Sequence, residues 1–256
     1  MTQPVIPTFS VVGQRVAAVG SLAVLAVAAV VSPHSALAVR AIPAAAALVW
    51  AAAALLHPGP GAAIAVLVAA LTSMTAAGMV WQVAMPSAIA VLFFASRACP
   101  SLGTVRESAG RAALGATFVC AAVTPFALLG WLALLHPDVS DLTRGLPRLD
   151  RRVLVLGGIA FALLNATCEE WIWRGIIQRR LTAIFPAYLA VSAQALSFGI
   201  MHAHGFPRGR VGVMLASSWA LMLGALRRHS SGLLAPTAAH VVADATIATI
   251  LILRMH

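Results

Sequence analysis

The sequence contains no lysine, only seven acidic residues and a single tyrosine among its 256 residues. Charged residues make up 9% of the chain and hydrophobic residues 61%, and the mean hydropathy is +0.94. Soluble domains carry about 25% charged residues, so this composition excludes a soluble globule. Because a membrane-spanning helix needs about 20 mainly apolar residues, we predict an all-α polytopic integral membrane protein with about eight transmembrane helices.

Cysteine is also scarce, and basic charge is supplied by one residue type. The three cysteines, at 99, 120 and 168, form no CxxC pattern, which excludes a disulfide framework and a zinc ribbon.

All 17 basic residues are arginines, and the net charge is +10. They stand singly or in pairs at the ends of apolar stretches, which indicates contacts with the lipid bilayer and excludes a nucleic-acid surface. Arginine without lysine, beside alanine-rich runs, suggests a bacterial protein of the inner (cytoplasmic) membrane.

Nine apolar stretches follow one another along the chain, with 61–96 readable as one helix or two. They lie at 11–31, 36–56, 61–80, 82–96, 111–135, 153–178, 186–203, 209–226 and 232–253. We assign 1–150 to N-terminal transmembrane helices of unassigned role and 151–256 to the functional core. The first stretch is read as a spanning helix, with a signal peptide cleaved near Ala38 as the alternative. The connections that carry arginine cannot all lie on one face of the membrane, so the orientation of the chain across the membrane stays open.

Three of the seven acids, Glu169, Glu170 and Asp244, lie in apolar sequence. A charge at the centre of a bilayer helix costs roughly 2.5–3.5 kcal/mol, so such residues usually face a partner or a water-filled cavity. Glu170 and Arg174 are four residues apart and should pair on one helix face, which leaves Glu169 unpaired. Asn165, four residues before Glu169, is expected to hydrogen-bond it.

The depth of Glu169 depends on the length of its helix. A single helix from 153 to the arginines at 179–180 would place Glu169 near its midpoint, within the membrane. A break at Gly175 would instead place Glu169 at the interface between membrane and water. The same Glu-Glu-x-x-x-Arg pattern also occurs on solvated helices, but the tryptophans and isoleucines that flank it here argue against a solvated face.

Two further polar pairs share the four-residue spacing. Phe198 and His202 end one apolar run, and His240 and Asp244 lie inside the last one. Each pair alone has a structural explanation, as a histidine with satisfied ring nitrogens or as a private His–Asp pair. Three such patterns in one membrane chain favour a shared site. His204 is expected to point away from it.

The three motifs, Glu169-Glu170-x-x-x-Arg174, Phe198-x-x-x-His202 and His240-x-x-x-Asp244, resemble the CAAX protease and bacteriocin-processing (CPBP, Abi) family of intramembrane endopeptidases. The resemblance covers roughly 150–253. Many family members end the third motif in asparagine, and this chain has Asp244 there. The ionised aspartate accepts hydrogen bonds but cannot donate them.

The resemblance implies a role for each motif residue. Glu169 would be the general base, with His202 helping to hold and polarise the water. His240 would stabilise the oxyanion, with Asp244 positioning it. The supporting residues would be Glu170, Arg174, Asn165 and Phe198.

Alternatives remain for both chemistry and function. Glu169, His202 and His240 are also a ligand set for catalytic zinc, although the chain has no HExxH and the resemblance implies a metal-independent enzyme, so we expect no cofactor. Cys168 as a nucleophile is disfavoured by its apolar neighbours. A proton-coupled transporter or a non-catalytic bacteriocin self-immunity protein would use the same polar groups differently. For an enzyme, the expected partner is a membrane-associated protein or peptide, cut in C-terminal processing, sorting or peptide maturation.

Overall fold

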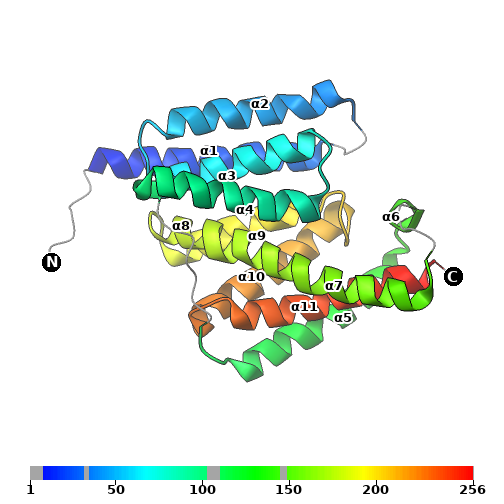
Figure 1. Cartoon of the computed structure of the whole chain (residues 1–256). Coiled ribbons are helices and arrows are strands. Elements are labelled where there is room, and N and C mark those ends of the chain that lie inside the picture. Colours follow the sequence, from blue (N-terminus) through cyan, green and yellow to red (C-terminus); the bar gives the residue numbers. More distant parts are fainter. Residues whose placement is uncertain (1–7, 32–34, 103–109, 145–148, 256) are drawn as a thin grey trace.

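The computed structural model describes residues 8–31, 35–102, 110–144 and 149–255, and these parts are helical and contain no strand (Figure 1). Two short elements, η1 (Pro100–Leu102) and α6 (Ser140–Arg144), lie in connections. The long helices are α1 (Thr8–Val30), α2 (Leu37–Ala54), α3 (Pro60–Ala76), α4 (Trp81–Ala98), α5 (Leu114–Leu135), α7 (Arg151–Glu170), α9 (Ala187–Met201), α10 (Gly209–Ser230) and α11 (Leu234–Leu253). The ambiguous stretch 61–96 therefore forms two helices, α3 and α4.

The molecule is an integral membrane protein. Six helical segments of the described chain are long and apolar enough to cross a membrane, and α3 and α9 are shorter apolar helices. Large apolar side chains such as Leu114, Phe126 and Leu134 are 77–81% exposed on the outside of the bundle. Such an apolar exterior fits lipid and not water, so the predicted all-α membrane fold is confirmed.

Local sequence explains several helix boundaries. Asp150 caps α7 by accepting a hydrogen bond from the backbone nitrogen of Arg152 at 2.8 Å, as N-terminal caps commonly do. Pro60 begins α3, where its missing N–H costs nothing. Pro43, Pro86 and Pro125 lie inside α2, α4 and α5, as membrane helices tolerate when neighbouring groups satisfy the freed carbonyls.

The helices form two groups that share one hydrophobic core. Helices α1 to α4 pack together in the upper part of Figure 1, and α7, α9, α10, α11 and α5 pack below them. Helix α9 contacts α1, and α4 contacts α7. One buried cluster includes Leu67 of α3 and Met85 of α4 together with Ile172 and Phe198. The helices of 1–150 and those of 151–256 therefore share one packed core.

Candidate active site

The helix that carries Glu169 is continuous. Helix α7 runs directly into η2 (Trp171–Gln178), a π-helical segment, and then into α8 (Arg179–Thr182). Together they form one span of 32 residues, and Gly175 does not interrupt it. Glu169 lies near the middle of this span, as the single-helix interpretation predicts. A π-helical segment of this kind is rare and often marks a functional site.

Glu170 is the central acceptor of a buried charged cluster. Its Oε1 atom accepts a hydrogen bond from Arg174 NH1 at 2.8 Å, and both side chains are completely buried. The same oxygen also accepts a hydrogen bond from Nδ1 of His240 at 2.7 Å. The predicted Glu170–Arg174 pair is therefore confirmed. Glu170 has a second role that the spacing does not reveal, because it links α7 to α11 through His240.

Glu169 points into a different environment from Glu170. Its Oε1 atom accepts a hydrogen bond from the indole Nε1 of Trp81 in α4 at 3.1 Å. Its Oε2 atom lies 3.6 Å from His240 Nε2, which is too long for a direct hydrogen bond. The expected Asn165–Glu169 hydrogen bond is wrong, since Asn165 Nδ2 donates to Asp244 Oδ2 at 3.1 Å instead. Asp244 of α11 thus takes the place of Glu169 as the acceptor for Asn165.

Asp244 lies near His240 without bonding it. The distance from Asp244 Oδ1 to His240 Nε2 is 3.8 Å, whereas Glu170 lies at hydrogen-bonding distance from the other ring nitrogen. The direct contact that orients the His240 ring therefore comes from Glu170. Asp244 is itself held by Asn165 of α7.

His202 follows the last residue of α9 and faces the other motifs across Phe198. Its Nδ1 lies 3.0 Å from the carbonyl oxygen of Phe198. Because a carbonyl only accepts, Nδ1 donates this bond, and Nε2 of the neutral ring is left as an acceptor. The Phe198 ring lies 4.7 Å from the His202 ring and 6.0 Å from the His240 ring, measured between centroids. The guanidinium of Arg174 lies 4.9 Å from the centroid of the Phe198 ring. The Phe198 ring therefore packs against both histidines and the arginine.

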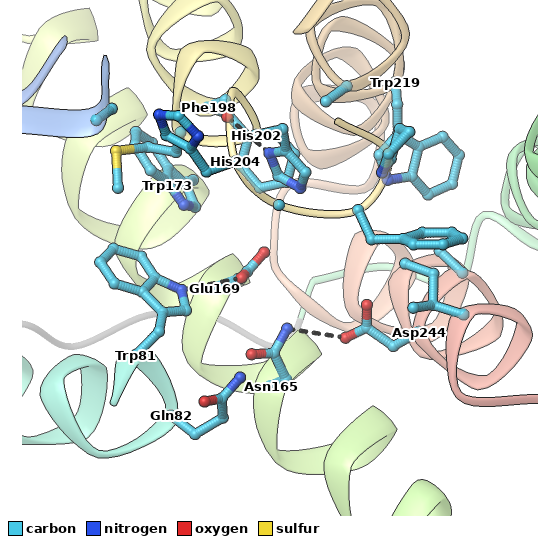
Figure 2. Close-up of a pocket in the computed structure, with 18 of the residues that line it drawn as sticks. Trp81, Gln82, Asn165, Glu169, Trp173, Phe198, His202, His204, Trp219 and Asp244 are labelled. Carbon is cyan, nitrogen blue, oxygen red and sulfur yellow. Dashed lines mark hydrogen bonds between the residues drawn. The ribbon is translucent and has the colours of Figure 1, made fainter. Parts of the chain in front are cut away.

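One cavity of about 740 Å³ joins these residues. Glu169, His202, His240 and Asp244 all line it, among mainly apolar side chains from both helix groups. Figure 2 shows the Glu169 carboxylate pointing into this space, between Trp81 and His202, with Asp244 opposite. His204 is also among the residues that line the cavity, and its Nε2 lies 3.2 Å from the carbonyl oxygen of Val30 in α1.

Comparison with known protein families identifies the part of the chain that carries the motifs. Residues 151–246 match the model of the Rce1-like family, which is described as type II CAAX prenyl endopeptidase Rce1-like. The match confirms the resemblance, and at family level it supports an intramembrane endopeptidase that acts on membrane-associated protein or peptide. No curated protein and no solved structure matches the chain.

The candidate zinc ligands do not form a compact group. Across the described residues, no three His, Cys, Asp or Glu side chains are grouped so that they could hold a metal ion. Glu169 Oε2 lies 3.6 Å from His240 Nε2, but His202, whose Nε2 stays available as an acceptor, does not join them in such a group. The observed arrangement does not fit a three-ligand zinc site. Absence of a cofactor remains a prediction.

Trp81 is the site residue that sequence reasoning missed. It belongs to α4, outside the segment that matches the Rce1-like family, and 88 residues separate it from Glu169. A tryptophan at the start of an apolar helix is typical of the membrane interface, so the sequence carries no signal for this contact.

Proposed function

We propose that the protein is an intramembrane endopeptidase in which Glu169 activates a water molecule to hydrolyse a peptide bond of a membrane-associated protein or peptide. One observation carries this proposal: a buried carboxylate and two imidazoles from three different helical segments face a single, mostly apolar cavity. Peptide hydrolysis needs a base for water and donors for the developing oxyanion.

The proposed base is Glu169. Its Oε1 atom is occupied by the Trp81 indole, which leaves Oε2 to accept a proton from water. The resulting hydroxide attacks the carbonyl carbon of the peptide bond. His202, with Nε2 available as an acceptor, is proposed to hold the same water. After the C–N bond breaks, the proton held by Glu169 passes to the leaving amine.

His240 is the proposed partner of the oxyanion. Its Nδ1 donates to Glu170, and this bond fixes the ring with Nε2 toward Glu169 and the cavity. When Nε2 carries a proton, it donates to the oxygen that gains charge. Asp244 and Asn165 form the next layer, and their hydrogen bond ties α11 to α7 beneath the site.

The test is a comparison of membrane-protein termini in cells that carry the wild-type protein or the Glu169→Ala variant. We expect a set of new C-terminal or internal termini in wild-type cells that the variant lacks, and the bacterial cytoplasmic membrane is the proposed compartment. Thr167→Ala is the matched control, because Thr167 is exposed on the same helix and does not line the cavity.

Identical termini in the two strains, with both proteins inserted at equal levels, would overturn the hydrolytic function. That result would favour the non-catalytic or transport function. Loss of insertion by Glu169→Ala alone would indicate that the polar groups only support the fold.

A further inference from the structure

A groove separate from the site cavity lies where the two helix groups meet. Its volume is about 420 Å³, and it is lined by Arg15, Val16, Val19, Gly20, Trp50 and Phe185. These residues belong to α1, to α2 and to the turn between α8 and α9. Val16 and Val19 are 54% and 56% exposed. The groove therefore opens on the outside of the bundle, where lipid chains contact the protein.

One wall of the groove is an aromatic ring that packs on a glycine. A Cβ added at Gly20 would come within 2.1 Å of the Trp50 ring, so any larger residue there would displace the ring. The Trp50 indole nitrogen donates to the Ala17 carbonyl oxygen at 3.0 Å, which fixes the ring against α1. The shape of the groove is therefore set by the packing of α2 on α1.

Arg15 is exposed and is held at the groove by the turn between α8 and α9. Its Nε donates to the Ile184 carbonyl oxygen at 2.7 Å, and its Cζ lies 5.3 Å from the centroid of the Phe185 ring. Among the described residues, no carboxylate pairs with Arg15. The two terminal nitrogens of the guanidinium therefore keep their N–H donors for an anion.

The surroundings of the groove are basic and lie near the membrane surface. The start of α1 and helix α8 lie at the same end of the bundle, on the left in Figure 1. Helix α8 adds Arg179 and Arg180, and helices α1, α2, α3, α8 and α9 contain no acidic residue. Trp50 stands four residues before the end of α2, as tryptophans at the membrane interface do. The anion available at this depth is a lipid phosphate.

We propose that this groove binds an anionic phospholipid, with the phosphate at Arg15 and one acyl chain along Val16, Val19 and Trp50. Arginine binds phosphate through parallel N–H donors, and the apolar walls match a hydrocarbon chain. Because α1, α2 and the turn between α8 and α9 all contribute to the groove, the bound lipid holds the two helix groups together. This inference does not depend on hydrolysis.

The test uses the fluorescence of Trp50. Purified full-length protein in a neutral detergent is titrated with phosphatidylglycerol brominated on its acyl chains, which quenches nearby tryptophans. A second titration uses brominated phosphatidylcholine, whose phosphate is balanced by choline. The chain has six tryptophans, so Trp50→Phe gives the signal of the others. We expect half-maximal quenching of Trp50 at about fivefold lower phosphatidylglycerol than phosphatidylcholine, which corresponds to about 1 kcal/mol for one arginine near an anionic headgroup.

Substitutions assign this preference to the groove. Arg15→Gln should make the two lipids equal, and Val19→Phe, which fills the groove and keeps Arg15, should weaken the quenching of Trp50 by both. Arg97→Gln is the matched control and should keep the preference. Arg97 is exposed, lies 4.5 Å from the Phe93 ring centroid and does not line the groove. Elution volume and the unfolding midpoint without lipid verify the fold of each variant.

Equal quenching of Trp50 by the two lipids, a preference that survives Arg15→Gln, or unchanged quenching in Val19→Phe would overturn the inference. An equal loss of preference in Arg15→Gln and Arg97→Gln would indicate attraction by overall charge and would overturn it as well. Competition by millimolar glycerol phosphate would assign Arg15 to a soluble phosphate and reject the lipid. The membrane-protein termini of Glu169→Ala cells bear only on hydrolysis, so the two failures are distinguishable.

Discussion

At the residue scale, two adjacent glutamates have different surroundings because successive helix positions point about 100° apart. Glu170 is fully buried between Arg174 and His240, and it neutralises a guanidinium that would otherwise be isolated in the core. Glu169 faces the cavity and is held by a single neutral donor, Trp81. The fixed carboxylate thus orients the histidine, and the less constrained one is available for chemistry.

Trp81→Phe tests the positioning of Glu169. The substitution keeps an aromatic ring and removes the N–H that bonds Oε1, so we expect kcat to fall about tenfold with little change in KM, since a lost hydrogen bond to a charged group costs about 1.5–3 kcal/mol. The assay uses a substrate found by the comparison of termini.

Trp50→Phe is the matched control for Trp81→Phe. The Trp50 indole donates to the Ala17 carbonyl oxygen at 3.0 Å and lies outside the site cavity. The Trp50→Phe variant should lose this indole hydrogen bond without a change in kcat. Equal kcat losses in the two variants would mean that Trp81 acts only through stability.

At the element scale, close approach between α9 and α10 fixes where His202 lies. A Cβ added at Gly199 would come within 1.9 Å of Ser217 Oγ and 2.6 Å of the Val213 carbonyl oxygen. The second of these atoms is backbone and cannot rotate away. Glycine therefore lets the end of α9, with Phe198 and His202, pack directly on α10, as small residues do between membrane helices.

Gly199→Ala should separate α9 from α10 and displace His202. We expect a loss of about 1–3 kcal/mol in unfolding free energy, as for other overpacked sites, and reduced cleavage. Gly130→Ala in α5 is the control, because a Cβ there meets nothing within 4 Å, and the change should be neutral or stabilise by up to about 1 kcal/mol. Unfolding in detergent is the measurement, and similar midpoints for the two variants would contradict this view of the contact.

At the scale of the whole molecule, the segment that matches the Rce1-like family does not contain the complete site. Residues 151–246 supply the three motifs, whereas α4 supplies Trp81, and Arg40 of α2 lines the same cavity. Buried residues of both helix groups also form one hydrophobic cluster. The N-terminal helices are therefore walls of the cavity as well as membrane anchors.

Expression of the chain in two pieces tests this dependence. Residues 151–256 alone should be inserted poorly and should not restore the missing termini, because the faces of α7, α8 and α9 that pack on α4, α3 and α1 would be uncovered. Co-expression with 1–150 should restore copurification and cleavage. Full cleavage by 151–256 alone would show that the N-terminal helices are dispensable.

The sequence by itself determined the properties that depend on composition and on spacing within one helix. Apolar runs fixed an all-α membrane protein, and the four-residue spacing of Glu170 and Arg174 fixed their ion pair. The three motifs indicated the candidate active-site residues because charged groups in apolar helices are costly.

Only the tertiary structure decided which partner each polar group received. Trp81 bonds Glu169 across 88 residues, Asn165 bonds Asp244 across 79, and His240 bonds Glu170 across 70. Helical periodicity relates residues three or four apart, and it carries no information about which faces of distant helices meet. The packing of α4 and α11 against α7 made those choices.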